Sequence, residues 1–306
     1  MASPVIAVAP DTLPVMHRAL VDAVREGGAE VGPLSDAEGL VWADPGAADA
    51  FPTVIAEGSG VRWIQLPYAG IEPFAHHLDT DHVWTCGKGV YAAPVAEHAL
   101  TLGLAGLRRL DRYARADRWE APVGTNLLGG TVTIIGAGGI ATELIGLLAP
   151  FGAAVRVVRR RDEPFTGAEV VPFQRAHQAL PGADLVVIAC ALTAETTGLV
   201  DGDFLAAMEP HAWLVNVGRG GHVVTGDLVD ALDARVIGGA GLDVTDPEPL
   251  PQGHPLWSRP NCIITPHIAN TPEMGLPLLA ERVRDNVERW CQGEDLIGLV
   301  DVEAGY

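Results

Sequence analysis

The sequence has little positive charge and few cysteines. Its 306 residues include 20 Lys and Arg against 39 Asp and Glu, which gives a formal net charge of −19. This balance disfavours nucleic acids and anionic membrane surfaces as partners, because both carry dense negative charge. The four cysteines are widely spaced and form no C-x-x-C pair. They therefore indicate neither a metal site nor a disulfide framework, and they fit a reducing compartment.

Signals for export and for membrane insertion are also lacking. The N-terminal residues show no basic segment followed by an apolar one, so no signal peptide is predicted. The longest charge-free run, residues 121–142, is interrupted by glycines and is not predicted to span a membrane. We therefore expect a cytoplasmic protein.

The composition does allow a large core. Hydrophobic residues make up 48% of the chain and charged residues 19%, so general disorder is excluded, and the length suggests two domains. In the first part, apolar runs typical of buried strands occur at residues 4–9, 39–42, 61–66 and 82–86, and residues 13–24 have helical spacing. This alternation predicts a parallel α/β domain over residues 1–95.

The same alternation recurs after an apolar helix predicted from residue 95, which we expect to cross between the domains. Predicted strands at 131–135, 154–158, 183–189, 212–217, 236–242 and 262–265 alternate with helices at 139–150, 203–208 and 225–233. A last amphipathic helix, 274–292, is expected to pack on the first domain. The prediction is two doubly wound parallel-sheet domains. A Rossmann-type nucleotide domain, residues 96–273, is inserted into a discontinuous flavodoxin-like substrate domain, residues 1–95 plus 274–306.

One glycine-rich turn follows the strand predicted at 131–135. Gly136, Gly138 and Ala141 fit the pattern G-x-G-x-x-G/A, which lets a pyrophosphate approach the backbone at a helix N-terminus. Alone the pattern is weak, because an ordinary strand-to-helix turn explains it equally well.

The next strand ends in arginines. An acidic residue about 20 residues beyond the glycines selects NAD in such folds, whereas this chain has Arg159 and Arg160 there. A guanidinium offers a fork of donors to a 2′-phosphate. NADP(H) is therefore the predicted cofactor, with NAD(H) possible. The alternatives are a solvated basic turn and a ribose contact from Asp162.

Three later segments each carry one charged or titratable residue: Arg219 after a buried strand, Glu248 among prolines and His267 in Thr-Pro-His. Taken alone, each of these residues is more often a solvated or structural side chain than a catalytic one. Their chemistry is complementary. A carboxylate beside an imidazole raises the imidazole pKa and favours a protonated, donating ring, and arginine matches an anionic carboxylate.

Several strings in the same order carry a more specific resemblance. They are the glycine turn, 192–197 (LTAETT), 216–220 (NVGRG), 242–244 (LDV), 248–251 (EPLP), 254–257 (HPLW) and 265–269 (TPHIA). With them the chain resembles the D-isomer-specific 2-hydroxyacid dehydrogenase family over nearly its whole length. Departures from the family pattern at Gly139, Ala189, Ala191 and Tyr91 remove no catalytic group.

The resemblance implies roles for individual residues. Arg219 matches the arginine that binds the substrate carboxylate and carbonyl, His267 the general acid/base, and Glu248 the carboxylate that holds that histidine. Ala69 and Gly70 match a loop whose amides grip the substrate carboxylate. The cofactor positions implied by the resemblance and by the two motifs above are Gly136, Gly138, Gly139, Ile140, Arg159, Arg160, Thr193, Val217 and Asp243.

The expected function is thus reduction of a small anionic 2-oxo acid to a D-2-hydroxy acid with NADPH, as in glyoxylate/hydroxypyruvate reductases. Two alternatives stay open: an NAD-dependent oxidative enzyme resembling phosphoglycerate dehydrogenase, and a non-catalytic dinucleotide-sensing protein resembling a corepressor. The resemblance also implies a homodimer formed through the nucleotide domain, including residues 100–130.

Overall fold

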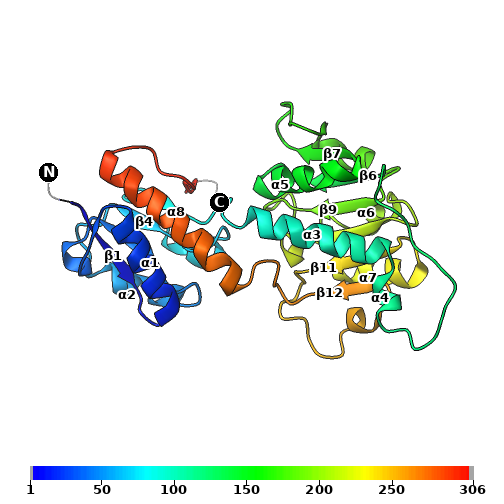
Figure 1. Ribbon diagram of the computed structural model, residues 1–306, viewed down its shortest axis with the longest axis horizontal. Helices are drawn as coiled ribbons and strands as arrows, with labels where there is room; N and C mark the ends of the chain where they lie inside the picture. Colours follow the sequence, from blue (N-terminus) through cyan, green and yellow to red (C-terminus); the bar gives the residue numbers. More distant parts are fainter. Residues whose placement is uncertain (1–2, 303–306) are drawn as a thin grey trace. The chain divides into compact units, whose positions relative to one another are not determined.

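The computed structural model describes residues 3–302, and the chain forms two compact units. Unit 1 comprises Met1–Tyr91 and Thr271–Tyr306, and unit 2 comprises Ala92–Asn270. Both are α/β units built on all-parallel sheets, so the two parallel-sheet domains predicted from the sequence are confirmed. Figure 1 shows the course of the chain and labels many of its helices and strands.

Unit 1 contains a five-stranded sheet in the order β2-β1-β3-β4-β5. This is the flavodoxin-like strand order, in which the chain winds outward in both directions from β1. The short strands are β1 (Val5–Ala9), β2 (Glu30–Val31), β3 (Gly39–Trp42), β4 (Trp63–Gln65) and β5 (Val83–Thr85).

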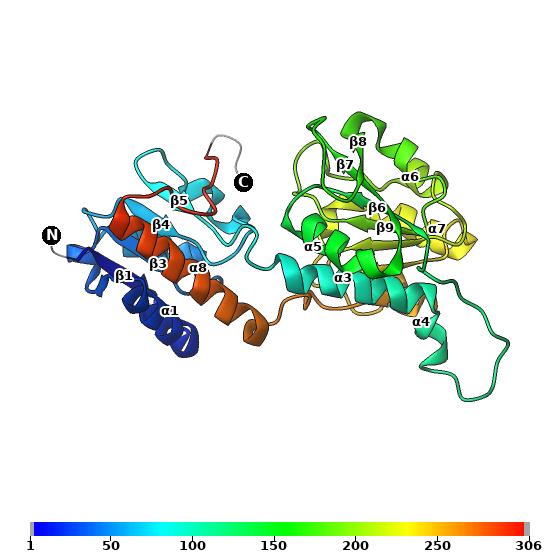
Figure 2. The ribbon, with the colours of Figure 1, turned by 45° about the horizontal axis from the view of Figure 1, so that its top comes forward.

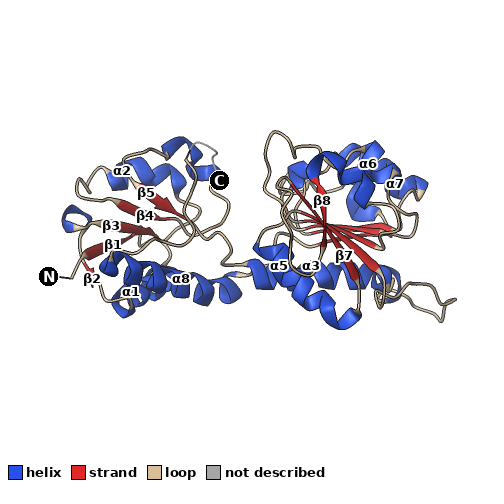
Figure 3. Ribbon diagram, turned by 90° about the horizontal axis from the view of Figure 1, so that it is seen from above, coloured by secondary structure: helices blue, strands red, loops and turns tan. Residues whose placement is uncertain are grey.

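Helices cover both faces of this sheet: α1 (Pro14–Glu26) and α8 (Pro272–Gln292) lie on one face and α2 (Phe51–Ile55) on the other (Figure 3). Helix α8 packs against α1 along a stripe of Leu279, Val283 and Val287, spaced four residues apart as one face of a helix requires. The C-terminal helix therefore completes the core of the N-terminal unit.

Unit 2 contains a seven-stranded sheet in the order β12-β11-β10-β9-β6-β7-β8, which is a Rossmann-type order extended by one strand. The central strands are buried on both faces, as their continuous apolar runs predict. The strands are β6 (Thr131–Ile135), β7 (Ala154–Arg159), β8 (Glu169–Pro172), β9 (Leu185–Ile188), β10 (Trp213–Asn216), β11 (Gly239–Leu242) and β12 (Cys262–Ile264).

Two helical layers enclose the seven-stranded sheet (Figure 3). Helices α3 (Ala92–Leu107) and α5 (Gly139–Leu148) pack together on one face, and α6 (Gly202–Ala206) and α7 (Thr225–Ala234) on the other. In such a fold, ligands bind beyond the carboxyl ends of the strands. The loops after β6, β7, β10, β11 and β12 all leave that edge, and they carry most of the residues singled out in the sequence.

Two features of unit 2 were not predicted. The edge strand β8 has only four residues and one buried side chain, so its apolar signal is weak. After the short helix α4 (Leu110–Tyr113), the chain runs out from the sheet as a long loop before it enters β6 (Figure 2). Within residues 3–302, no helix has both the length and the hydropathy needed to cross a lipid bilayer.

Candidate active site

His267 and Glu248 form a hydrogen-bonded pair beyond the carboxyl ends of β11 and β12. The Nδ1 atom of His267 lies 2.6 Å from Oε1 of Glu248. Because a carboxylate only accepts, Nδ1 carries the proton and donates it, which leaves Nε2 as the ring atom available to a ligand. About half of each side chain is exposed, 52% for His267 and 42% for Glu248. The pair is therefore accessible and fixed in orientation.

The backbone at His267 adopts a left-handed conformation, with φ of 54°. Such a conformation is uncommon for a residue other than glycine and marks a locally constrained position. The His267 amide donates to the carbonyl of Asp243 at 2.8 Å and to that of Thr265 at 3.0 Å. The imidazole therefore leaves a backbone that is tied to the end of β11.

Asp243 anchors the loop that carries His267. Its buried carboxylate accepts from the Thr265 hydroxyl at 2.6 Å and from the amides of Ile268 and Ala269 at 2.9 and 3.0 Å. His98 of α3 lies 2.9 Å from the Thr265 hydroxyl and 3.4 Å from the same carboxylate. The sequence predicted a cofactor contact for Asp243. In the structure both of its carboxylate oxygens accept hydrogen bonds from residues 265–269.

These contacts set the charge of Asp243. Burial alone would raise the pKa of this carboxyl, but the hydrogen bonds from His98, Thr265 and the two amides outweigh it and lower the pKa to about 2. The group is therefore a carboxylate at every pH at which the protein is expected to work. It supplies a fixed negative charge that is hydrogen-bonded to residues 265–269.

Arg219 follows β10 in a loop whose backbone is held from several sides. The Asn216 side chain donates to the Arg219 carbonyl at 2.9 Å and accepts from the Gly218 amide at 3.1 Å. The His222 ring lies 3.1 Å from the Arg219 amide nitrogen. The Arg219 guanidinium donates to the Gly218 carbonyl at 2.9 Å. Arginine is thus fixed at the carboxyl edge of the sheet.

The Arg219 loop and the Glu248 loop are in contact. A Cβ atom at Gly220 would overlap the carbonyl of Thr245, so only glycine allows the two backbones to approach this closely. The Thr245 amide in turn faces the Glu248 carboxylate at 3.4 Å. The structure therefore brings the loops of Arg219, Glu248 and His267 to the ends of three adjacent strands, β10, β11 and β12.

The glycine turn after β6 has the geometry that its sequence predicts. Gly136 has φ of 120°, and a Cβ atom there would come within 2.5 Å of the Ala189 carbonyl, so the turn requires glycine. At Gly138, a Cβ atom would meet nothing within 4 Å, and α5 begins at Gly139. The open space lies beside the first, unpaired amides of a helix, which suits a pyrophosphate.

Arg159 ends β7, the strand next to β6. Its guanidinium lies 3.5 Å from the Glu163 carboxylate and 5.7 Å from the centre of the Phe165 ring. The side chain is 17% exposed, whereas that of Glu163 is 63% exposed. Arg160 lies 4.0 Å from Glu195 and is more exposed. The arginines are thus held by surface carboxylates at the sheet edge where the glycine turn lies.

Ala69 and Gly70 lie in unit 1, in the loop between β4 and the helical turn at Glu72–His77. Within residues 3–302, the amides of Tyr68, Ala69 and Gly70 donate to no described acceptor. The loop is fastened by other groups, because the Gly87 amide donates to the Tyr68 carbonyl at 3.0 Å and the Tyr91 hydroxyl to the Pro67 carbonyl at 2.7 Å. Consecutive unpaired amides are suited to an anion.

The remaining predicted positions lie in the same edge loops of unit 2. Ile140 is in the first turn of α5, Thr193 follows β9 and donates its amide to Thr196 at 2.8 Å, and Val217 is buried after β10. Sequence reasoning missed three polar residues that support the site, His98, Asn216 and His222. Of the three, only Asn216 belongs to one of the motifs noted in the sequence, the string at 216–220.

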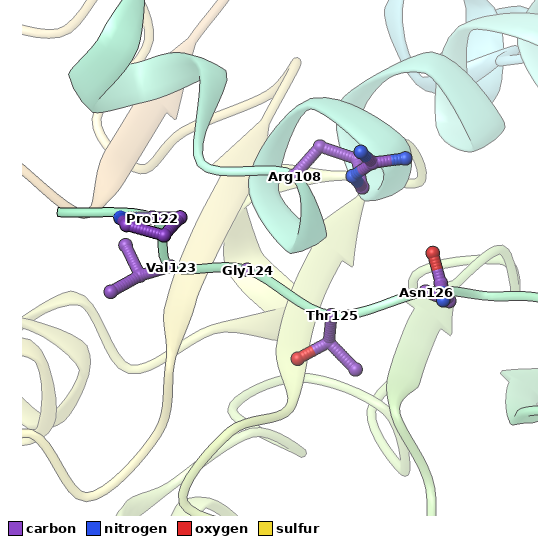
Figure 4. A pocket seen from close by; sticks show the side chains of 6 residues that line it. All are labelled: Arg108, Pro122, Val123, Gly124, Thr125 and Asn126. Carbon is purple, nitrogen blue, oxygen red and sulfur yellow. The ribbon is translucent and has the colours of Figure 1, made fainter.

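A shallow pocket elsewhere in unit 2 is not part of this site. It is lined by Arg108 and by residues 122–126 of the loop after α4 (Figure 4). It contains none of the residues predicted to bind cofactor or substrate. Among residues 3–302, no group of three or more His, Cys, Asp or Glu side chains is arranged to hold a metal ion.

Comparison with known proteins assigns the family. Residues 99–269 match the model of the D-isomer specific 2-hydroxyacid dehydrogenase, NAD binding domain. The chain belongs to this family. It is therefore an NAD(P)-dependent oxidoreductase of 2-hydroxy acids, and the family predicted from the sequence motifs is confirmed.

Individual relatives of the enzyme span most of its length. It is 38% identical to an uncharacterized protein in the proB 3' region of Corynebacterium melassecola, with 93% of this chain and 95% of the other covered. It is 33% identical to the glyoxylate reductase/hydroxypyruvate reductase of Homo sapiens over 79% and 77% of the two chains. Its structure matches that of an NADPH-dependent glyoxylate/hydroxypyruvate reductase from Sinorhizobium meliloti in complex with NADP and sulfate. That match has 25% identity, a TM-score of 0.80 and coverage of 99% and 100%.

Proposed function

We propose that the enzyme reduces a small 2-oxo acid to the D-2-hydroxy acid with NADPH. The observation that carries the proposal is the 2.6 Å hydrogen bond between His267 and Glu248, next to the Arg219 loop, in a member of this family. Relatives named as glyoxylate/hydroxypyruvate reductases, one of them NADPH-dependent, support the substrate class and the direction.

The proposed mechanism assigns separate roles to His267, Glu248 and Arg219. A dinucleotide held through its pyrophosphate at the glycine turn would supply a hydride from its reduced nicotinamide to the substrate carbonyl carbon. Negative charge then develops on the carbonyl oxygen, and His267 donates a proton to it from Nε2 while Glu248 holds Nδ1. Arg219 binds the substrate carboxylate and the carbonyl oxygen, and it supplies positive charge that a chain of net charge −19 otherwise lacks.

Further contacts complete the proposal. The amides of Ala69 and Gly70 bind the substrate carboxylate, because both lack an acceptor among the described residues. Gly136, Gly138, Gly139 and Ile140 bind the pyrophosphate at the start of α5. Thr193, Val217 and Asp243 lie in loops at the same sheet edge, and we assign them to the cofactor pocket.

NADP(H) is the proposed cofactor because Arg159 stands at the end of β7, where an NAD enzyme has an acidic residue. Its partner Glu163 is 63% exposed, so solvent screens the ion pair between the two side chains. A 2′-phosphate, with more charge and more acceptor oxygens than one carboxylate, competes well for this guanidinium. Arg160 adds a second positive charge.

The direct test is turnover of a panel of 2-oxo acids with NADPH and with NADH. Glyoxylate, hydroxypyruvate, pyruvate and oxaloacetate cover small, hydroxylated, methylated and dicarboxylic substrates. We expect NADPH oxidation with at least one of the first three and a D-configured product by chiral chromatography. Turnover with NADH alone would overturn the cofactor assignment. Dinucleotide binding without turnover of any 2-oxo acid would overturn the reductase assignment.

We also propose a homodimer formed through the loop after α4. Trp119 is fully exposed in this loop, and Leu110 and Val123 are about half exposed. The loop is itself ordered by contacts at its base, since the Tyr113 hydroxyl donates to the Ala121 carbonyl at 2.8 Å and accepts from the Val123 amide at 2.7 Å. An exposed tryptophan on a fixed loop is typical of an interface anchor.

Sedimentation of the wild type and of Trp119→Ser tests the dimer. We expect a dimer for the wild type and a monomer for the variant at micromolar concentration. Val15→Ser, which removes an exposed apolar side chain from α1 in unit 1, serves as the matched control and should remain dimeric. A wild type that sediments as a monomer at every concentration would exclude this interface.

A further inference from the structure

His222 is a completely buried histidine that the proposed mechanism does not use. It lies three residues after Arg219, in the helical turn Gly220–His222, and its side chain is 0% exposed. Burial lowers its pKa, which favours the neutral ring. A neutral imidazole has one donor and one acceptor nitrogen, and both need partners in a buried site.

Both ring nitrogens have partners of the right kind. Nδ1 lies 3.1 Å from the amide nitrogen of Arg219 and 2.9 Å from its carbonyl oxygen, and Nε2 lies 3.4 Å from Sγ of Cys190. With a bare Nδ1 the ring accepts from the Arg219 amide, and with a protonated Nδ1 it donates to the Arg219 carbonyl. In either tautomer the ring joins the backbone of Arg219 to Cys190, two residues beyond β9.

Cys190 is suited to be the fixed end of this link. Burial raises its pKa to about 11, so its sulfur is a thiol and not a reactive thiolate. Its backbone carbonyl lies close to Gly218, because a Cβ atom at Gly218 would come within 3.2 Å of that carbonyl and within 3.0 Å of the His222 ring. The ring, the thiol and the loop backbone are therefore packed without spare room.

We propose that His222 is a positioning residue that fixes the Arg219 backbone, and thereby aims the guanidinium at the substrate carboxylate. The inference rests on the proposed role of Arg219. Arginine recognises a carboxylate through two parallel hydrogen bonds, so a small tilt of its backbone costs much of the interaction. The guanidinium donates to the Gly218 carbonyl, and the backbone of Arg219 is held by Asn216 and His222.

Two amide variants test the contacts of the two ring nitrogens of His222 separately. The amide of asparagine reaches about as far as Nδ1 and that of glutamine about as far as Nε2. His222→Asn should therefore keep the bond to Arg219, and His222→Gln should keep only the approach to Cys190. We expect the KM for the best 2-oxo acid to stay within about threefold of wild type for Asn. It should rise about tenfold or more for Gln and for His222→Phe, because a misaimed guanidinium loses a charged hydrogen bond to the substrate carboxylate. The Kd for NADPH should not change in any of them.

A double-mutant comparison excludes a purely structural role. If His222 acts through Arg219, His222→Gln should lower kcat/KM about tenfold in the wild type and less than about twofold in an Arg219→Ala background. A side chain that only supports the fold would lower kcat/KM by the same factor in both. Thermal stabilisation of the enzyme–NADPH complex by oxalate, a planar dicarboxylate, gives a readout that needs no turnover, and it should weaken for Gln but not for Asn.

The outcomes distinguish the inference from its premise. If Arg219→Ala leaves kcat/KM unchanged, the proposed role of Arg219 is wrong and His222 has nothing to position. If Arg219→Ala is impaired but the Asn and Gln variants are equal in KM, the positioning role is wrong while the function stands. If His222→Phe fails to fold, the comparison of the Asn and Gln variants decides whether His222 positions Arg219.

Discussion

Two regions of unit 2 carry the proposed chemistry, and they are held in different ways. Residues 265–269, with His267, are fastened by a buried carboxylate that accepts three hydrogen bonds. The turn after β7, with Arg159, is held by an exposed glutamate and an aromatic ring. Buried charged hydrogen bonds are costly to break, whereas exposed ion pairs contribute little.

The difference follows from what each region has to do. Proton transfer requires an imidazole placed within hydrogen-bond distance of one oxygen atom, so its backbone must be fixed before the substrate arrives. Recognition of a 2′-phosphate requires a guanidinium that can exchange a weakly bound carboxylate for the phosphate. A rigid catalytic loop and an adaptable selectivity turn on one sheet edge are therefore consistent with a single reductase.

The largest expected effect comes from removing the imidazole. His267→Ala should lower kcat by about 10²–10⁴, the usual contribution of a positioned general acid, because the carbonyl oxygen then lacks its proton donor. The Kd for NADPH should change by less than about twofold. Steady-state kinetics and fluorescence titration measure the two quantities.

His211→Ala is the matched control, since His211 is exposed and pairs with Asp184 at the amino ends of the strands. It should retain wild-type kcat. Full turnover by His267→Ala would remove His267 from the mechanism, and equal losses in both variants would point to a general loss of folded enzyme.

A smaller effect is expected at the adaptable turn. Arg159→Asp should lower the ratio of kcat/KM for NADPH over NADH by about 10- to 100-fold, which is the range for losing one charged hydrogen bond. Most of the change should appear in the KM for NADPH. Activity with NADH should persist, because the ion pair of Arg159 with the exposed Glu163 contributes little to the fold.

Arg18→Asp makes the same change of charge on the exposed surface of α1 in unit 1 and should leave the ratio unchanged. A wild-type ratio below one, or a ratio that Arg159→Asp does not move, would exclude Arg159 as the selectivity residue. The contrast between the two regions would then lose its functional meaning.

The sequence predicts this arrangement unevenly. The strands β6, β9 and β10 are buried on both faces, so each is a continuous apolar run and was predicted within two residues at either end. The edge strand β8 and the two-residue strand β2 bury too little to leave such a pattern. Burial in the sheet, more than intrinsic propensity, decides which strands are visible in a sequence.

The residues of the candidate site were also predicted unevenly from the sequence. Arg219, Glu248 and His267 lie in distinctive strings, so motifs could single them out. Some of the residues that support them left no such signal, because their contacts join distant parts of the chain. His98, for example, lies 167 residues from Thr265, in a largely apolar helix. A hydrogen bond over such a separation leaves no periodicity in either segment.

The smallest effect tests the rigid anchor through stability. The pKa of Asp243 is lowered from 3.8 to about 2, and one pKa unit corresponds to about 1.4 kcal/mol, so its ionised form contributes about 2 kcal/mol to folding. Because the folded-state pKa is the lower one, this contribution is present above pH 4 and is lost as the pH falls toward 2. Asp243→Asn should therefore destabilise unit 2 by about 2 kcal/mol at pH 7, and the difference from wild type should shrink between pH 4 and pH 2.

Urea unfolding at several pH values, followed by tryptophan fluorescence, measures this difference. Asp230→Asn changes an exposed carboxylate of α7 and should show neither the loss at pH 7 nor the convergence in acid. A loss for Asp243→Asn that stays constant down to pH 2 would mean that shape, and not charge, makes Asp243 the anchor. The rigidity of the loop that carries His267 would then come from packing, and its contrast with the Arg159 turn would no longer be one of buried against exposed charge.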